Sequence, residues 1–430
     1  MSTMASKVDA IVQAHIPIHG PGVAVAIIQH EHILHCQGYG LANLEWEQPI
    51  TPATVFGIGS ITKPFTATAI LLLEQQGKLS LDDPIQRHLP DYPTHGEQIT
   101  MQHLLTHTSG IPNFVTREGF WQQHAPLHKS FTELTALFQH LPLDFAPGTR
   151  YGYSNSAYCL LGKIIENLSG MSYGDFIQTQ VFAPMGMTCS HYISHEPIIA
   201  RRAGTYEKTE TGYQHAPNVS ATQTYSAGGL GSTLEDFIHW EAALREERLL
   251  DRATQERMYT PVQLVDGRTE NYGLGWALNP YRRQHVVCHA GGIPGYSAFF
   301  GRFMDYDTTL IVLSNIGGFD GAGLARKLSH LVLDLPELVH NPITLDPTLP
   351  AKISGTYHRI YEAVQISPDA QTITLYGAQT YHLVPTERDS FYCAENEDIE
   401  ISFEQADERG YQRVRIVEPF FWFTADKTER

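Results

Sequence analysis

The chain has 430 residues, more than one hydrophobic core usually holds, so two domains are expected. It is 42% hydrophobic and 17% charged, without a low-complexity segment, which is typical of a globular protein. The formal net charge of −17 argues against nucleic acids and anionic membranes as partners, and no apolar run approaches the roughly 18 residues of a membrane span.

The start of the chain shows no targeting segment. Met1 to Gln13 is mixed polar and lacks the apolar run of a signal peptide, so a cytoplasmic location is expected. No metal or other cofactor is expected either. The cysteines fit reduced thiols because they are odd in number, scattered and without the spacing of metal ligands; they are Cys36, Cys159, Cys189, Cys288 and Cys393.

The first elements in the chain are a predicted helix and a predicted β-hairpin. The helix covers Ala5 to Ala14, and the strands cover Gly22 to Ile28 and Ile33 to Gly40. The histidines at and after the turn, His30-Glu31-His32 and His35, are potential metal ligands. A turn with polar residues at its tip explains them better, and we interpret them so.

A glycine-rich stretch then leads into the next helix. Thr66 to Gln76 is rich in helix-forming residues. Gly57 and Gly59 permit an unusual backbone path, and Pro64 is tolerated only in the first turn of a helix. Ser60 is therefore predicted at a helix N-terminus, where unpaired N–H groups and the helix dipole favour negative charge.

Lys63 follows Ser60 by one helical turn and lies on the same face. A hydroxyl beside an amine at a helix N-terminus has what an acylating serine needs, namely a base for its proton and N–H donors for the oxyanion. On the Ser-x-x-Lys spacing alone, a capping serine followed by a solvated lysine is the better interpretation, because the spacing recurs by chance. The choice between these interpretations depends on partners elsewhere in the chain.

The middle of the chain, from about residue 80 to 230, is predicted to be a mostly helical insertion. It includes a helix over Thr100 to Thr106 and a loop that ends at Pro112. From Tyr272 the periodicity becomes that of strands, and a last helix is expected over Ala322 to Leu335. The predicted strands are Gly273–Leu278, Val286–Ala290, Tyr296–Met304 and Thr308–Ser314, with turns at Pro280–Arg283 and Asp305–Asp307.

A proline-rich connector predicts a domain boundary. The expected division is a first domain over 1–340, a linker over 341–352 and a second domain over 353–430. Short alternating runs in the second domain predict a small antiparallel barrel or meander with an aromatic core. These runs are Gly355–His358, Ala363–Ser367, Thr372–Tyr376, His382–Pro385, Glu400–Phe403, Gln412–Val417 and Phe420–Thr424.

Tyr153 and Asn155 flank the start of an amphipathic helix predicted over Ser156 to Leu168. A phenol near the Lys63 ammonium would have a lowered pKa and could act as base and proton shuttle. Asn155 could orient Lys63 and bind a substrate amide. A buried tyrosine and a capping asparagine explain the same motif as well.

His289-Ala290-Gly291-Gly292 ends a predicted strand. Its glycines would let a substrate lie along the strand edge, although a glycine-rich turn would have the same sequence. Together, Ser60-x-x-Lys63, Tyr153-x-Asn155 and His289-x-Gly291 resemble the three motifs of the serine β-lactamase and penicillin-binding protein superfamily. They are most similar to its class C branch and to related esterases and D-aminopeptidases.

The resemblance spans about residues 18 to 335 and implies a fold and a set of roles. The implied α/β (α+β) fold is an antiparallel sheet flanked by helices with a helical subdomain, and the C-terminal domain resembles lipocalin-like barrels. A serine would be acylated, and water would hydrolyse the acyl-enzyme. The implied roles are nucleophile for Ser60, general base for Lys63 with Tyr153, substrate binding for Asn155, His289 and Gly291, and an oxyanion hole from the backbone N–H groups of Ser60 and Gly292.

One motif departs from the family pattern. Where many relatives have Lys-Thr-Gly, Ala290 cannot donate a hydrogen bond through its side chain, and His289 is expected to be only partly charged near neutral pH. Substrates that depend on a carboxylate, such as β-lactams and D-Ala-D-Ala peptides, should therefore react poorly. The expected function is a serine hydrolase acting on small esters, amides or short peptides, as an esterase or a D-aminopeptidase does.

Other functions would use the same residues. A β-lactamase or D-Ala-D-Ala carboxypeptidase remains open, as does a covalent penicillin-binding receptor or scaffold that acylates without turnover. An α/β-hydrolase would need Gly-x-Ser-x-Gly, and both Gly152–Ser156 and Gly295–Phe299 lack the final glycine. The sequence does not indicate the oligomeric state.

Overall fold

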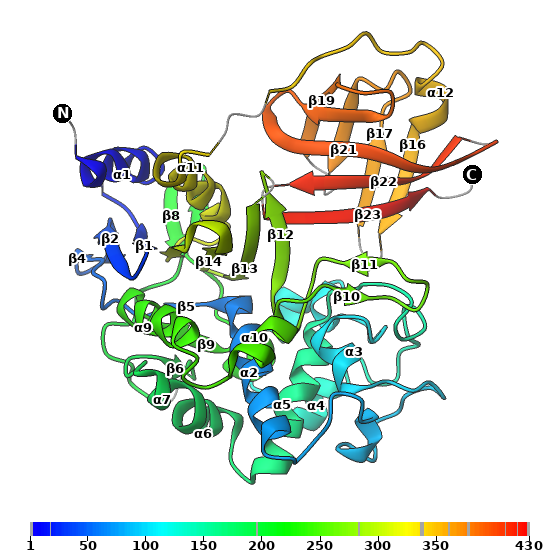
Figure 1. The fold of residues 1–430 in the computed structure, drawn as a ribbon. Coiled ribbons are helices and arrows are strands. Elements are labelled where there is room, and N and C mark those ends of the chain that lie inside the picture. Colours follow the sequence, from blue (N-terminus) through cyan, green and yellow to red (C-terminus); the bar gives the residue numbers. More distant parts are fainter. Residues whose placement is uncertain are drawn as a thin grey trace. The chain divides into compact units, whose positions relative to one another are not determined.

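The computed structural model forms two compact units, Met1–Leu278 with Gln284–Asp334 and Asn279–Arg283 with Leu335–Arg430 (Figure 1). We propose, from the sequence, that the two predicted domains fold independently. No helix in the described part of the chain combines the length and apolar composition needed to cross a membrane. The structure describes residues 3–17, 19–194, 197–282, 284–335, 339–359, 362–375, 379–408, 410–418 and 420–427.

The first unit is built around a six-stranded sheet in which the N-terminal hairpin joins strands from the end of the unit. β1 pairs antiparallel with β15, so Val23 lies opposite Ser314. In sheet order the strands are β12 Ala277–Tyr281, of which only Ala277 and Leu278 belong to this unit, β13 Gln284–Ile293, β14 Tyr296–Phe303, β15 Thr308–Ser314, β1 Val23–Gln29 and β2 His32–Tyr39.

Both faces of this sheet are covered by helices (Figure 1). Alternate residues of a strand point to opposite faces, and neighbouring residues of β14 show this. Phe299 faces α11 Gly321–Leu333, beside which lies α1 Met4–Gln13. Phe300 packs against Phe237 and Trp240 of α9 Leu234–Arg245, with ring centroids 5.7 and 4.4 Å away. The fully buried pattern of β14 follows from this double cover.

One predicted strand lies elsewhere in the structure. Gly273 donates a backbone hydrogen bond to the carbonyl of Trp276, so this segment turns, and β12 begins only at Ala277. Pro280 was expected in the following turn but lies within β12. A strand accommodates a proline at a position where no ladder hydrogen bond is donated.

The helical part of the unit is arranged around α2 Thr62–Gln75, of whose fourteen residues eleven are buried. Such a helix is apolar all round because other elements surround it. α5 Asn155–Ser169 packs beside it (Figure 1). The other helices are η1 Gly59–Ile61, η2 Ile85–Arg87, α3 Met101–Leu105, η3 Phe114–Thr116, η4 Phe120–His124, α4 Phe131–Thr135, α6 Tyr173–Phe176, η5 Ile177–Phe182, α7 Ala183–Met185, α8 Ala221–Gly228, α10 Arg252–Met258 and η6 Met304–Tyr306.

The first unit also contains short strand pairs that were not predicted from the sequence. β7 and β8 form a hairpin around the polar turn at 210–211, and β9 joins β5 to β6. Elements this short carry too few residues to show a period. The short strands are β3 Leu41–Asn43, β4 Gln48–Pro49, β5 Phe56–Gly57, β6 His191–Tyr192, β7 Tyr206–Thr209, β8 Gly212–His215, β9 Leu230–Ser232, β10 Val262–Gln263 and β11 Thr269–Glu270.

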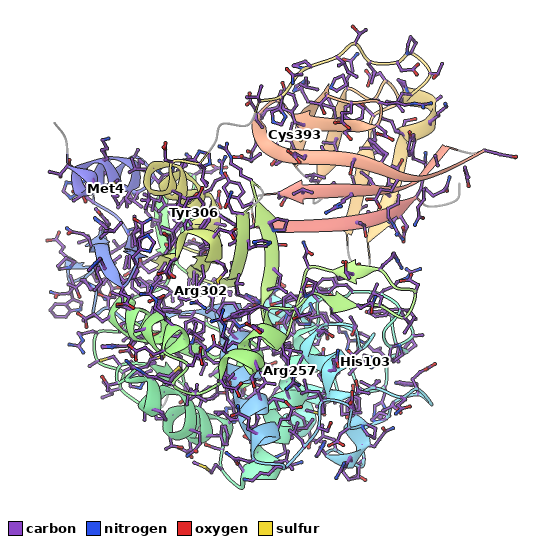
Figure 2. The ribbon with its side chains drawn as sticks, viewed as in Figure 1. Met4, His103, Arg257, Arg302, Tyr306 and Cys393 are labelled. Atoms are coloured by element: carbon purple, nitrogen blue, oxygen red, sulfur yellow. The ribbon has the colours of Figure 1, made fainter. Side chains whose placement is uncertain are left out.

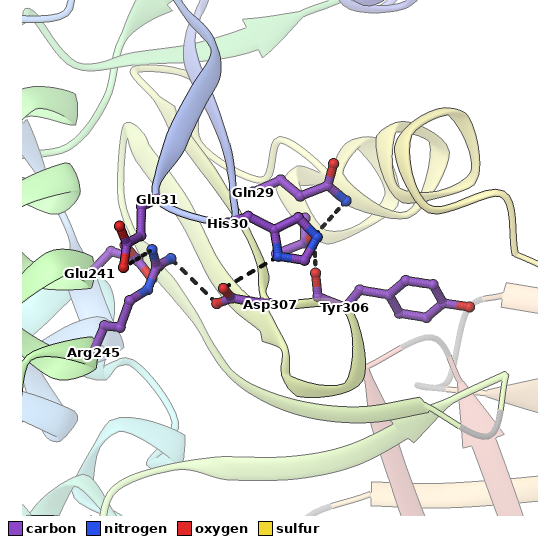
Figure 3. Close-up of polar contacts among 8 residues, drawn as sticks. Gln29, His30, Glu31, Glu241, Arg245, Tyr306 and Asp307 are labelled. Carbon is purple, nitrogen blue, oxygen red and sulfur yellow. Dashed lines mark hydrogen bonds and ion pairs between the residues drawn. The ribbon is translucent and has the colours of Figure 1, made fainter.

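A charged cluster ties α9 to the tips of two hairpins (Figure 3). Arg245 lies 2.8 Å from Glu241, 3.4 Å from Asp307 and 3.9 Å from Glu31. His30 in turn lies 3.5 Å from the carboxylate of Asp307. His30 and Glu31 both have positive φ, as residues of a tight turn do, and His35 bonds the Tyr39 hydroxyl at 2.7 Å. This cluster therefore holds the hairpin to the helix layer.

The second unit contains a closed antiparallel barrel, as the sequence predicts. Its core includes Tyr357, Phe391, Phe403 and the buried Cys393, which is labelled in Figure 2. Tyr376 and the side chains of Phe421, Trp422 and Phe423, also expected in the core, lie outside the described residues. The elements are α12 Pro350–Ile353, β16 Gly355–Arg359, β17 Glu362–Ile366, β18 Thr372–Leu375, β19 Gln379–Pro385, β20 Ser390–Cys393, β21 Asn396–Asp407, β22 Gly410–Glu418 and β23 Phe421–Lys427.

Candidate active site

Ser60 lies in η1, directly before α2, as the glycines and Pro64 predict. Neither of these fully described helices begins with a side-chain cap, so the interpretation of Ser60 as a helix cap is wrong. The Ser60 hydroxyl instead lies 3.1 Å from the Nζ atom of Lys63. The two side chains therefore meet as the spacing of the motif predicts.

Lys63 is completely buried, which rules out the interpretation as a solvated lysine. Its Nζ lies 2.8 Å from Oδ1 of Asn155 and 2.9 Å from the backbone oxygen of Ala227. Burial disfavours the charged ammonium and lowers the pKa of Lys63 to about 7. An amine that is half neutral near neutral pH can accept a proton.

The hydrogen bonds of Lys63 also determine where that proton would come from. The carbonyl oxygens of Asn155 and Ala227 can only accept, so the two N–H bonds of a neutral amine go to them. The nitrogen lone pair is then left for the hydroxyl of Ser60. Neutral Lys63 is therefore arranged to receive the proton of Ser60.

Tyr153 lies beside both residues, with Nζ of Lys63 4.6 Å from the centroid of its ring. The expectation that the ammonium lowers the pKa of Tyr153 is wrong. Burial raises this pKa well above its usual value, although a hydrogen bond with Ser60 acts in the opposite direction. Tyr153 is thus a protonated phenol at neutral pH, which suits it to donate a proton rather than to accept one.

The loop at 107–114 fixes the Tyr153-x-Asn155 motif. The backbone N–H of Ser154 donates to Nδ1 of His107 at 3.0 Å. The backbone and side-chain nitrogens of Asn155 both donate to Oδ1 of Asn113, at 3.1 and 3.2 Å. Because the amide nitrogen of Asn155 is held this way, its oxygen faces Lys63.

β13 brings His289 to the same cluster. Its Nδ1 is 2.6 Å from the carbonyl of Ala290, which can only accept, so Nδ1 carries the hydrogen. Nε2 then accepts from the Tyr272 hydroxyl at 3.0 Å. Burial and the nearby Lys63 lower the pKa of His289 to about 3, so the expected partial charge near neutral pH is wrong. His289 is neutral throughout the physiological range.

The predicted oxyanion-hole residues lie where η1 and β13 approach each other. A Cβ atom at Gly291 would lie 1.9 Å from the carbonyl oxygen of Ile58 and 3.1 Å from the backbone nitrogen of Ser60. A Cβ atom at Gly59, whose φ is +50°, would lie 2.6 Å from the backbone nitrogen of Gly292. Only glycine permits this approach, which brings the backbones of Ser60 and Gly292 together.

Several contributors were not found from the sequence. The Ala227 carbonyl reaches Lys63 because Tyr225 interrupts α8 with φ +36° and ψ −131°. The backbone oxygen of Ser226 accepts a hydrogen bond from the hydroxyl of Thr66 in α2 at 2.7 Å, and this bond holds α8 to α2. Backbone carbonyls and strained dihedrals leave no residue-type signal, so only the tertiary structure identifies them. Tyr272 and His107 are likewise recognised only through their neighbours.

Two hollows meet at the site. Glu207, Lys208 and the start of β14 line one of them together with Gly292. The other is mainly apolar and reaches Ser60; it is lined by Ser60, Phe114, Val115, Phe120, Trp121, Asn155, Val219, Gln223, Thr224, Ala227, Gly228, Gly292 and Ile293.

Comparisons with known proteins identify the relatives of this chain. The chain is 34% identical over 305 residues to a penicillin-binding protein of Bacillus subtilis, covering 66% of this chain and 65% of that protein. It is 30% identical to a D-aminopeptidase of Gluconobacter oxydans, covering 68% of this chain and 56% of the relative. The matches thus span less than two thirds of the length of these relatives.

A solved structure of D-amino acid amidase from Ochrobactrum anthropi SV3, complexed with D-phenylalanine, is also similar. The TM-score is 0.65 at 26% identity, covering 78% of this chain and 99% of that chain. A family model described as beta-lactamase matches residues 8–333, and this range contains every predicted site residue. The chain therefore belongs to the β-lactamase family.

Proposed function

We propose that the chain hydrolyses small esters and amides through an acyl-enzyme on Ser60. As Oγ of Ser60 bonds to the substrate carbonyl carbon, neutral Lys63 takes the hydroxyl proton. The backbone N–H groups of Ser60 and Gly292 stabilise the negative oxygen of the tetrahedral intermediate. The observation that carries the proposal is the buried Lys63 amine, 3.1 Å from Ser60 with both of its other hydrogen bonds made to carbonyl oxygens.

Tyr153 is assigned to the departing group. Its raised pKa keeps the phenol protonated, and it shares a hydrogen bond with Ser60, so it can give a proton to the leaving amine or alkoxide when the bond to the carbonyl carbon breaks. The Lys63 ammonium, 4.6 Å from the Tyr153 ring centroid, is the source from which the phenol is reprotonated. Water then attacks the acyl-enzyme while neutral Lys63 takes one proton of that water. Lys63 gives this proton to Oγ of Ser60 as the bond between Oγ and the acyl carbon breaks.

Substrates that do not depend on a carboxylate are favoured. Ala290 offers no side-chain donor and His289 is neutral, so neither binds a carboxylate as the Lys-Thr-Gly pattern does. Similarity to a D-aminopeptidase and a D-amino acid amidase supports D-aminoacyl amides among the amide substrates. We therefore propose short acyl esters and D-aminoacyl amides ahead of penicillins and D-Ala-D-Ala peptides.

Labelling with a fluorophosphonate, followed by mass mapping and by hydrolysis assays on esters and D-aminoacyl amides, tests this proposal. Label should appear on Ser60, and Ser60→Ala should fold normally and lose both labelling and hydrolysis. Ser154→Ala is the matched control, because this serine caps α5 and lies outside the proposed chemistry. Label on another serine would refute the assignment, and a burst without steady turnover would favour the covalent receptor instead.

A further inference from the structure

Gln223 is a buried amide in the wall of the active-site pocket. It lies in α8 and is 1% exposed. Its Nε2 donates to the backbone oxygen of Leu127 at 2.9 Å. Its Oε1 has no hydrogen-bond partner among the described residues. A buried acceptor without a donor is unfavourable, and such groups in folded proteins call for an explanation.

The orientation of this amide is determined by its neighbour. A backbone carbonyl can only accept, so the nitrogen of the Gln223 side chain must face Leu127. The oxygen therefore occupies the other branch of the amide. Rotating the amide would place its oxygen against the carbonyl oxygen of Leu127. The unpaired group is thus an acceptor, and its partner must be a donor.

The pocket that contains Gln223 is the one that reaches the predicted nucleophile. Ser60, Asn155 and Gly292 line it, and Phe114, Phe120 and Val219 supply apolar walls. A group bound there stays next to the reacting carbonyl. The other hollow, which also begins at Gly292, has the charged residues Glu207 and Lys208 instead. The apolar pocket therefore suits the acyl part, which stays attached to Ser60 through both steps.

We propose that Oε1 of Gln223 accepts a hydrogen bond from an N–H group of the substrate's acyl part, so that the pocket selects acyl groups carrying both an apolar side chain and an N–H donor. An aminoacyl group with a hydrophobic side chain has these features. The inference rests on the proposed function, because it assumes acylation of Ser60. It makes Gln223 a specificity-determining residue that takes no part in the proton transfers.

The test compares two methyl esters that differ only in the donor, D-phenylalanine methyl ester and methyl 3-phenylpropanoate. Each kcat/KM is divided by the rate of the same ester with hydroxide, which removes the intrinsic activation by the amino group. Native protein should prefer the amino ester about ten- to a hundredfold after this correction, the value of a hydrogen bond to a buried acceptor. Gln223→Met should lose most of this preference while keeping its rate on the deamino ester.

Thr224→Val is the matched control, since Thr224 lines the same pocket but its hydroxyl already bonds the carbonyl of Ala221. It should keep the native preference. If the native protein shows a corrected ratio of kcat/KM between the amino ester and the deamino ester near one, the inference is overturned. This outcome does not depend on whether Gln223→Met folds. A preference that survives in folded Gln223→Met overturns it as well.

The outcomes separate this inference from the proposed function. Hydrolysis of the deamino ester together with fluorophosphonate label on Ser60 would uphold the acyl-enzyme chemistry, whatever Gln223 does. If that chemistry holds and the amino ester has no corrected advantage, only the role of Gln223 is refuted. If neither ester reacts and Ser60 takes no label, the proposed function fails, and the inference that rests on it fails with it.

Discussion

The pKa of Lys63 gives a direct test of the proposed base. Burial lowers this pKa from 10.5 to about 7. At 1.36 kcal/mol per unit, this corresponds to about 5 kcal/mol of preference for the neutral amine in the folded protein. At pH 7 about half of the molecules hold a neutral Lys63, against roughly one in three thousand for an unshifted lysine. Activity that needs the neutral amine should follow this titration.

The assay is kcat/KM for a small ester without a titratable group, from pH 5 to 9. We expect the value to rise about tenfold per unit below pH 6 and to level off above pH 8, with an apparent pKa near 7. Lys63→Arg should lose activity by orders of magnitude, because a guanidinium stays protonated. A rate that is flat between pH 5.5 and 8, or a rising limb centred above pH 9, would refute Lys63 as the base.

The same shift should appear in the stability of the fold. Between about pH 7 and 10.5 the unfolded chain binds the Lys63 proton and the folded chain does not, so stability rises with pH in this window. Compared with Lys63→Met, the free energy of unfolding of the native protein should rise by about 1.4 kcal/mol per pH unit there. Denaturant titrations at pH 7, 8 and 9 measure this difference, and a constant difference would contradict the buried amine.

Three further outcomes are expected. Lys63→Ala and Tyr153→Phe should each reduce kcat by orders of magnitude. The double variant should lose little more than the worse single variant, because both residues act on one proton. Losses that multiply fully would show that the two residues act independently. Ala290→Thr, with or without His289→Lys, should raise kcat/KM for penicillins relative to esters by roughly one to two powers of ten. In the native protein, the ratio of kcat/KM for penicillins to that for esters should not change between pH 6 and 9, because His289 stays neutral. A fragment of residues 1–344 should remain folded with a reactive serine, and an unfolded fragment would show that the barrel unit is needed for the fold.

Much of this protein can be read from local sequence patterns. Periodicity and turn residues predict α1, α2 and most strands from β13 onward to within a few residues, because apolar spacing fixes which face of an element is buried. They do not predict β20. The three motifs identify Ser60, Lys63, Tyr153, Asn155 and His289, which the structure brings into one cluster. Residue type and spacing suffice to identify these residues, since each motif places side-chain donors or acceptors at the end of a helix or strand.

Protonation states and backbone partners were decided only by the tertiary structure. A pKa depends on how much water the fold removes, and no local pattern contains that information. Burial thus reversed the expectation for Tyr153, made Lys63 rather than the phenol the candidate base, and left His289 neutral. The position of the Ala227 carbonyl depends on the strained backbone at Tyr225. The orientation of the Gln223 amide, whose Oε1 has no partner among the described residues, depends on Leu127 in a distant loop. The sequence determined which reactive groups the chain carries, and packing around them determined which can take a proton and which must give one.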